Sequence, residues 1–491
     1  MNYLKKLAGQ SLIYGLGTIV PRLLNFAILT PFYTRVFGRA EYGIISELYA
    51  YIVVFMVILT YGLETSFFRF ASKNSDRKNI VYSTLSLSLF ITSGFFILIV
   101  FFNLSSVSSL IGYQEHKEYI LWCAIILGVD AFAALPFAKL RLEEKVKKFT
   151  IIKLVSIFFI LIVSFVILKF AKEYEGNNAF FSKLYNDDIG VGYVFLINLF
   201  GSLISFLFLA KEIFSISLKF DFKLYRNVLT YSFPLLVSGL AGSINEAIDR
   251  IILKHFSDDP IHALETVGLY GANYKLAVFM TLYIQMFKYA VEPFFFEQAK
   301  SKDAKDMYST VMNYFFILGL IIFLAITVYI DVFKHFLGSD FHEGIRIVPV
   351  VLLANLLLGV FYNLSVWYKI NDLTRIGAYI TLSGSIITIV SNLILIPKIG
   401  YMGSAVTHLI CYSFMVIISY FLSIKYYFVN YPVSKLLGYL FIALVIFFIS
   451  NNLLSDLNPV VGYILKTTLF ALFIIFINFK EKLFSTFLLK T

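Results

Sequence analysis

The sequence is poor in charge and in cysteine, and both shortages restrict the class of protein. Only 14% of its 491 residues are Asp, Glu, Lys or Arg, whereas soluble domains carry about a quarter. The hydrophobic fraction is 59% and the mean hydropathy is +0.82, so a water-soluble fold of this size is excluded. The two cysteines, Cys123 and Cys411, lie in apolar runs and indicate neither a disulfide framework nor a metal cluster.

Other common signals are missing too. The chain has no Gly-rich nucleotide-binding motif ending in Lys-Ser or Lys-Thr, which argues against ATP as an energy source. Its six histidines show no metal-ligand spacing with Cys or with acidic residues. The formal net charge of +11 would suggest nucleic acid in a soluble protein, but in an apolar chain it indicates basic residues on one face of a bilayer. We therefore expect no cofactor, no metal and no nucleic-acid partner.

Long apolar runs dominate what is present. At about 20 residues per span, about fourteen helices would use about 280 residues, close to the hydrophobic fraction. The runs predict an all-α polytopic membrane protein, with helices near residues 11–31, 43–66, 80–103, 118–138, 150–169, 190–210, 232–254, 266–288, 308–330, 346–367, 378–396, 401–423, 436–454 and 460–479.

The distribution of basic residues predicts the orientation. With alternating loops, about 25 of the 41 Lys and Arg fall inside and about 10 outside, because translocation disfavours basic short loops. Both termini are thus predicted to be cytoplasmic, in a multi-pass protein of the cell inner membrane. The longest predicted outer segment, residues 171–190, is too short for a catalytic domain, so we do not expect an enzyme.

Two sets of six predicted spans share short motifs about 225 residues apart. Tyr82-Ser83-Thr84 corresponds to Tyr308-Ser309-Thr310, and Tyr42-Gly43 corresponds to Val267-Gly268. Because six spans is an even number, both halves begin on the same side of the membrane, and the repeats are predicted to be parallel. Two such bundles related by an axis along the membrane normal are expected to enclose a central cavity. The predicted organisation is an N-lobe (1–210), a cytoplasmic linker (211–231), a C-lobe (232–424) and a C-terminal part with two further helices (425–491).

Charges within the predicted spans are candidates for function, because a charge that faces lipid is costly. Arg22 is the deepest cation, about 16 Å along the first span and directly after Pro21. It either lines the cavity or pairs with Asp130 or Glu64. The other candidates for a cationic substrate site are Arg69, Lys153, Arg250 and Lys275; Arg69 and Lys153 could instead reach the headgroups.

Four acidic residues are candidates for coupling to an ion: Asp130, Glu246, Asp249 and Glu64. Asp130 is the best of them, because burial favours the neutral form of a carboxyl group. The alternative, which the sequence favours, is a structural acid held by hydrogen bonds or a salt bridge. Glu246 and Arg250 are four residues apart and could form an ion pair along one helix face.

Four short motifs carry a resemblance to a known family. They are Phe37-Gly38-Arg39-Ala40-Glu41-Tyr42-Gly43, the pair Asp249-Arg250, Val267-Gly268-Leu269-Tyr270 with Tyr274-Lys275-Leu276-Ala277, and Pro397-Lys398-Ile399-Gly400-Tyr401-Met402-Gly403. In their order and spacing the chain resembles the polysaccharide transporter family, the Wzx-like O-antigen and exopolysaccharide repeat-unit flippases. That family belongs to the multidrug/oligosaccharidyl-lipid/polysaccharide (MOP) exporter superfamily.

The resemblance implies two lobes in a V that alternates between inward-open and outward-open states. It implies transport of an undecaprenyl-pyrophosphate-linked oligosaccharide to the periplasmic leaflet, in O-antigen, capsule, lipopolysaccharide or exopolysaccharide biosynthesis. It further implies a cationic cavity, matched by Arg22 and Asp249-Arg250, with H⁺ or Na⁺ as coupling ion. Membrane lipids and polysaccharide polymerase machinery are the implied partners. The alternatives are a MATE-type drug or cation antiporter, a lipid II flippase, and a polytopic glycan polymerase or ligase.

Overall fold

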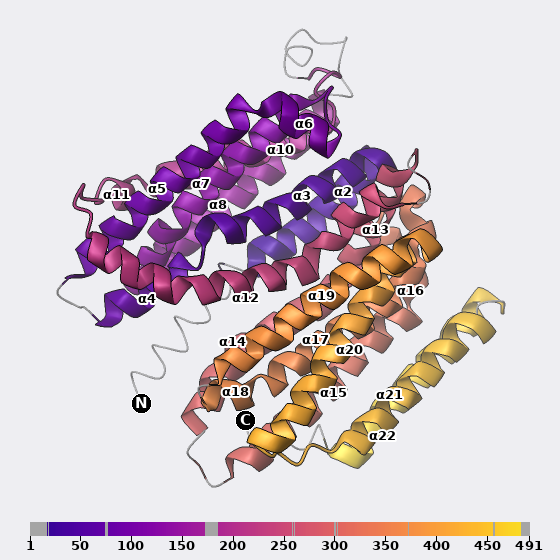
Figure 1. The fold of residues 1–491 in the computed structure, drawn as a ribbon. Helices are drawn as coiled ribbons and strands as arrows, with labels where there is room; N and C mark the ends of the chain where they lie inside the picture. The colour runs from indigo at the N-terminus through magenta and orange to yellow at the C-terminus, as the bar shows by residue number, and fades with distance from the viewer. Residues whose placement is uncertain are drawn as a thin grey trace. The chain divides into compact units, whose positions relative to one another are not determined.

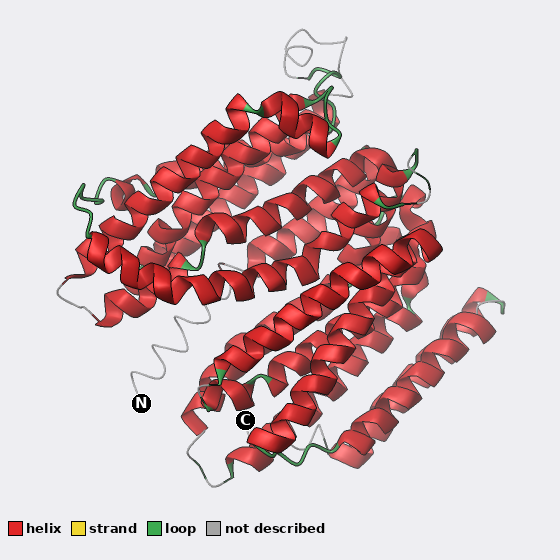
Figure 2. Ribbon diagram, in the orientation of Figure 1, coloured by secondary structure: helices red, strands yellow, loops and turns green. Residues whose placement is uncertain are grey.

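The computed structural model describes residues 17–482 apart from residues 18, 74–76, 172–184, 258, 260, 299–300, 302, 372 and 455–456. Within these ranges the chain consists of helices joined by loops and turns, with no strand (Figure 2). It divides into two compact units, Met1–Gly271 and Ala272–Thr491. The all-helical fold class is confirmed.

Eleven helices in the described part are long and apolar enough to cross a membrane. They are Arg39–Lys73, Lys78–Phe102, Lys117–Leu142, Val146–Ala171, Phe222–His255, Ala304–Val328, Ser339–Ile370, Thr374–Ile399, Tyr401–Tyr426, Val433–Leu453 and Pro459–Glu481. Of the three other predicted spans, the first lies partly outside the described residues. The sixth is a shorter apolar helix, Gly192–Phe208, and the eighth is divided in two at Ala277. The protein is a multi-pass membrane protein, and the number fourteen stays a prediction.

The first unit is a bundle in which α7 is the central helix (Figure 1). α7 packs against α3, α5 and α10, and α8 packs against α10. The elements of this unit are η1 (Asn25–Leu29), α2 (Thr30–Val36), α3 (Arg39–Thr60), α4 (Leu63–Lys73), α5 (Lys78–Phe102), α6 (Leu104–Ile111), α7 (Lys117–Leu142), α8 (Val146–Phe165), η3 (Val166–Ala171), α10 (Gly192–Phe208), α11 (Ala210–Ile213), α12 (Phe222–His255) and the start of α13 (Ala263–Leu276).

The second unit repeats these helix pairs in the same order. α17 packs against α14, α15 and α20, and α19 packs against α20. The parallel relation of the two repeats stays a prediction. The elements are α14 (Val278–Gln298), α15 (Ala304–Val328), α16 (Ile330–Phe333), η4 (Lys334–Phe336), η5 (Ser339–Ile347), α17 (Val348–Leu364), α18 (Val366–Ile370), α19 (Thr374–Ile399), α20 (Tyr401–Tyr426), α21 (Val433–Phe448), η6 (Ile449–Leu453) and α22 (Pro459–Glu481).

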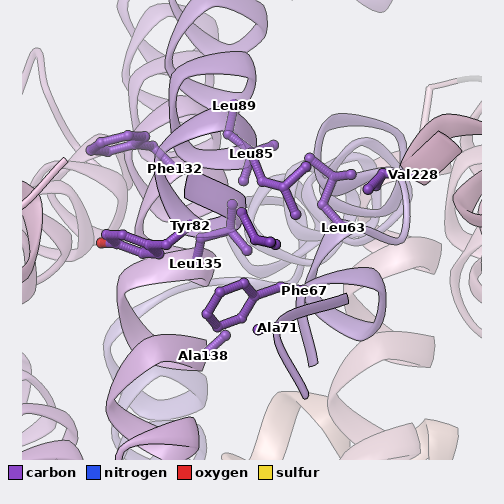
Figure 3. Packing of buried hydrophobic residues seen from close by; sticks show 11 residues of the cluster. Leu63, Phe67, Ala71, Tyr82, Leu85, Leu89, Phe132, Leu135, Ala138 and Val228 are labelled. Atoms are coloured by element: carbon purple, nitrogen blue, oxygen red, sulfur yellow. The ribbon is translucent and has the colours of Figure 1, made fainter. Parts of the chain in front are cut away.

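A buried apolar cluster holds one end of the first unit together (Figure 3). Phe67 of α4, Tyr82 and Leu85 of α5 and Leu135 of α7 are each at most 2% exposed, and Val228 of α12 joins them. Val228 lies in the segment 211–231, predicted as a linker, but α12 is already helical from Phe222 onward. α12 also packs along α3, and the boundary between the compact units falls beyond it, at Gly271. The division into lobes stays a prediction.

The start of α12 is fixed by Asp221, whose carboxylate accepts a 2.9 Å hydrogen bond from the Leu224 amide. Arg77 lies 2.9 Å from the same carboxylate. The Leu224 hydrogen bond is the main reason that the pKa of Asp221 lies below its usual value, and Arg77 lowers it further. A short polar residue before a helix is the usual N-cap, so the sequence did contain a signal for this extension.

Two polar clusters attach the last two helices to the second unit. At one end, the Glu481 carboxylate of α22 lies 2.7 Å from Lys435 Nζ of α21 and 2.9 Å from Asn313 Nδ2 of α15. Near the opposite end of α22, Lys466 Nζ lies 3.2 Å from the Asp331 carboxylate of α16. These helices are therefore an integral part of the second unit.

Candidate functional site

Three charged residues predicted from the sequence lie together in the first unit. Lys153 of α8 interacts electrostatically with Asp130 of α7 and with Arg22 of the N-terminal helical segment. Its ammonium group lies 4.0 Å from the centre of the Phe137 ring, and Ser202 of α10 interacts with Asp130. Arg22 is exposed, whereas Lys153 and Asp130 are half-buried. We call Arg22, Lys153 and Asp130 the charged cluster.

Parallel packing of the N-terminal segment on α8 brings Arg22 and Lys153 together. Gly17 lies against Thr150 and, further along, Phe32 lies against Phe165 with ring centres 4.3 Å apart. From the first contact to the second, both helices proceed toward their C-termini, so the two helices run in the same direction. This is expected for the first and fifth predicted spans, which cross the membrane in the same sense. Sequence reasoning considered an Arg22–Asp130 pair, but could not anticipate that Lys153 interacts with both residues.

Two more predicted residues, Glu64 and Arg69, lie on α4. Glu64 forms an ion pair with Arg141 of α7, and the Arg141 guanidinium lies 4.8 Å from the Phe68 ring centre. Arg69 is exposed, with its guanidinium 4.1 Å from the centre of the Tyr231 ring of α12. Glu64 thus joins α4 to α7. Arg141 also interacts electrostatically with Lys153, so a chain of charges continues from α4 to the charged cluster.

At the C-terminal end of α12, Asp249 and Arg250 form an ion pair with an N–O distance of 3.2 Å. Asp249 is 1% exposed and accepts a hydrogen bond from the Tyr270 hydroxyl of α13. Arg250 also donates a 3.0 Å hydrogen bond to the Glu246 main-chain carbonyl, and the predicted ion pair between the Glu246 and Arg250 side chains stays a prediction. Lys275, the remaining predicted cation, is an exposed residue of α13 and belongs to the second unit.

Sequence reasoning missed a buried ion pair in the same region. Glu47 of α3 is fully buried, and its carboxylate lies 2.8 Å from Lys254 Nζ of α12. The Tyr113 hydroxyl donates a 2.5 Å hydrogen bond to the same carboxylate oxygen, and Lys254 donates to the Ile111 carbonyl. Glu47 is an acid within a predicted span, which is the signal that could have identified it; its partner became evident only from the packing of α12 on α3.

Beside this ion pair, α3 and α13 cross in direct backbone contact at Gly43 and Gly268. A Cβ atom on Gly43 would lie 1.9 Å from the Leu264 carbonyl oxygen, and one on Gly268 would lie 1.9 Å from the Arg39 carbonyl oxygen. Each carbonyl is one helical turn before the opposite glycine, so the two contacts are equivalent. We call this contact the glycine crossing; both glycines belong to motifs that the repeat aligns with each other.

The chemistry of the charged cluster suits an anionic ligand. Arg22 and Lys153 outnumber Asp130 by one charge, and a guanidinium binds phosphate oxygens through two parallel hydrogen bonds. Within the residues that the structure describes, no three His, Cys, Asp or Glu side chains are grouped so as to bind a metal ion. The cluster is therefore a candidate for phosphate binding.

A comparison with protein-family models identifies the family of this chain. A family model described as "Polysaccharide biosynthesis protein" matches residues 7–299. "Lsg locus putative protein 1" of Haemophilus influenzae is 22% identical over 371 residues, which cover 74% of this chain and 84% of that protein.

Two solved structures share the fold. The lipid II flippase MurJ in an inward closed conformation gives a TM-score of 0.73 at 16% identity and covers 97% of this chain and 100% of its own. A MATE family multidrug resistance transporter of the MOP superfamily, in an inward-facing conformation, gives 0.66 at 12% identity, with coverages of 87% and 99%. At these identities the comparison shows the fold alone.

Proposed function

The chain belongs to the polysaccharide biosynthesis protein family, and we propose that it moves undecaprenyl-pyrophosphate-linked oligosaccharide repeat units from the cytoplasmic to the periplasmic leaflet. Its fold is shared by a lipid II flippase and by a multidrug resistance transporter, which supports a transporter over an enzyme. The finer statements are proposals: inner-membrane location with cytoplasmic termini, repeat units of O-antigen, capsule or exopolysaccharide, and alternating access of two lobes.

The charged cluster is the observation that carries this proposal. A pyrophosphate linked to a lipid and a sugar is a compact anion, and Arg22 together with Lys153 supplies two cationic groups from neighbouring helices. Asp130 balances part of that charge while no substrate is bound. Three further cations are proposed to interact with the pyrophosphate as it crosses the membrane. Arg69 and Arg250 belong to the first unit, and Lys275 belongs to the second.

Alternating access requires a contact that opens and closes, and the glycine crossing supports this step. It joins α3 and α13 at the end predicted to face the periplasm, where the Glu47–Lys254 pair lies beside it. We propose that release of the oligosaccharide requires both contacts to separate. Asp130 is the first candidate for H⁺ or Na⁺ coupling, ahead of Glu246, Asp249 and Glu64, because it interacts with the proposed phosphate-binding Lys153.

The test is complementation of a deletion strain. Deletion should cause lipid-linked repeat units to accumulate on the inner leaflet. We expect Arg22→Ala and Lys153→Gln to fail to restore surface glycan while the proteins still reach the membrane. Lys147→Ala changes an exposed lysine of the same α8 helix and serves as the matched control. Full glycan export by both cluster variants would overturn the assignment of the site.

The similarity to MurJ supports one alternative, a lipid II flippase. The two substrates share the polyprenyl pyrophosphate, so the charged cluster does not distinguish them. Depletion of the protein does: arrest of peptidoglycan synthesis indicates lipid II, whereas loss of surface glycan with continued growth indicates the repeat unit. Increased drug sensitivity with normal glycan would instead indicate a MATE-type antiporter.

A further inference from the structure

Residues 211–223, which we call the connecting segment, lead from α11 to the first turn of α12 and carry large apolar side chains that the first unit leaves uncovered. Phe214 is 87% exposed, Leu218 is 89% exposed and Phe222 is 73% exposed. The core contacts of the segment are made by two other residues, Ile213 and Ile216, which pack against the buried apolar cluster of α4, α5 and α7. Exposed apolar side chains so close together indicate an interaction surface.

Hydrogen bonds to α5 fix the backbone of the connecting segment. The Ser217 amide donates a 2.9 Å hydrogen bond to Ser83 Oγ. The Asp221 amide donates a 3.1 Å hydrogen bond to Thr84 Oγ1. Both acceptors belong to the Tyr82-Ser83-Thr84 motif, one of those that the predicted repeat aligns. The exposed side chains are therefore held on a backbone that α5 positions.

The connecting segment also presents positive charge. Its two acids are paired with cations from outside the segment: Lys148 Nζ lies 2.5 Å from the Glu212 carboxylate, and Arg77 lies 2.9 Å from the Asp221 carboxylate. Three lysines of the segment are exposed, and in the part of the chain that the structure describes none of them forms an ion pair: Lys211, Lys219 and Lys223. Exposed apolar side chains interspersed with lysines are typical of a surface that lies in the interface of an anionic membrane.

We propose that the connecting segment binds anionic phospholipid at the membrane surface. Phe214, Leu218 and Phe222 insert at the level of the headgroups, and the three lysines contact lipid phosphates. The position of the segment favours a bilayer over a protein partner, because it follows the apolar helix α10 and runs into the spanning helix α12. Its predicted cytoplasmic side is also the side on which anionic lipid attracts basic segments next to a span. This binding is independent of the proposed transport substrate.

Spin labelling of the full-length protein in proteoliposomes tests this inference. A nitroxide is attached through Leu218→Cys, and the two native cysteines are buried. Collisions of the label with oxygen, which concentrates in the bilayer, are compared with collisions with a water-soluble nickel chelate. In vesicles of phosphatidylcholine and phosphatidylglycerol we expect the label to be accessible to oxygen and shielded from the chelate. In vesicles of phosphatidylcholine alone the shielding should decrease.

Removal of the lysines should move the label toward water. In the labelled protein, Lys211→Gln/Lys219→Gln/Lys223→Gln should lower its partition into the phosphatidylglycerol vesicles by about fivefold for each lysine removed. Replacement of the same lysines by arginine should retain the partition. A matched control in the second unit removes three exposed cations that are also predicted to be cytoplasmic, and should leave the label unchanged: Arg375→Gln/Lys425→Gln/Lys480→Gln.

Three results would contradict the inference. The first is equal access of the nickel chelate in both kinds of vesicle, and the second is an unchanged label after the three lysines of the connecting segment are replaced by glutamine. The third is a label that the chelate reaches in proteoliposomes but not in native membrane vesicles. That result would assign the segment to a protein partner and overturn its assignment to lipid.

Discussion

Replacing Gly43 by alanine should shift the protein away from the conformation in which α3 and α13 cross. The new Cβ atom would lie 1.9 Å from the Leu264 carbonyl oxygen, a backbone atom that no side-chain rotation can move. The helices must therefore separate by about 1 Å to reach even the closest normal contact. Overpacking of this kind costs about 1–3 kcal/mol.

That cost applies only while the crossing is closed. The gain in helix propensity from Gly to Ala is present in both conformations and cancels from their ratio. A destabilisation of about 1–3 kcal/mol therefore raises the ratio of open to closed crossing by about 5- to 150-fold. Gly268→Ala should behave alike, because its Cβ atom meets the Arg39 carbonyl at the same distance.

Thiol labelling reads out this ratio. Ser46 packs against Gly271 next to the crossing, so the thiol introduced by Ser46→Cys is shielded while the helices touch. The two native cysteines are buried. In the Ser46→Cys background, Gly43→Ala should accelerate labelling of the introduced thiol by a membrane-impermeant maleimide in whole cells. Gly94→Ala on α5 is the matched control, because nothing lies within 4 Å of the added Cβ atom. Equal labelling rates with and without Gly43→Ala would refute the reasoning.

Two further predictions concern the neighbouring charges. Glu47→Ala should destabilise the protein in thermal unfolding by up to about 3–5 kcal/mol, because it leaves the half-buried Lys254 without its carboxylate, and a second change, Lys254→Met, should restore most of the loss. No loss of stability in Glu47→Ala would contradict the importance of the pair. The hydrogen bond to Asp259 raises the pKa of His262, just before α13, above its usual value. Protonated His262 therefore stabilises this turn at low pH, and the stabilisation disappears as the pH rises through the raised pKa. Hydrogen exchange of the Ile261 and His262 amides, which donate to Asp259, should accelerate over that interval; exchange that shows only the intrinsic pH dependence would contradict it.

Most of the helices could be predicted from the sequence, because an apolar run long enough to span a bilayer has few other stable conformations. The breaks were harder to predict. The chain interrupts the predicted eighth span at Ala277, where no Gly or Pro marks a boundary. In contrast, the kink between α3 and α4 occurs at Tyr61 and Gly62, both with positive φ, and glycine there is a visible signal.

The partners of the charged residues could not be predicted to the same degree. Depth along a span follows from counting residues, so Arg22 and Asp130 were found. Which helix faces which depends on packing, and neither the Glu64–Arg141 pair nor the burial of Glu47 against Lys254 follows from residue counts. Arg250 pairs with its neighbour Asp249 and donates to the Glu246 carbonyl, an arrangement that spacing along the helix does not predict.

The glycine crossing also bears on how such a chain could have arisen. The predicted repeat aligns Gly43 with Gly268, and each contacts the opposite helix at the same kind of backbone atom, a carbonyl oxygen. In a symmetric homodimer, residues that meet their own copy lie on the twofold axis of an isologous interface. A contact between matching residues within one chain is what such an interface becomes after gene duplication and fusion. If the predicted repeat is correct, it implies an ancestral homodimer in which a single glycine formed both sides of the contact.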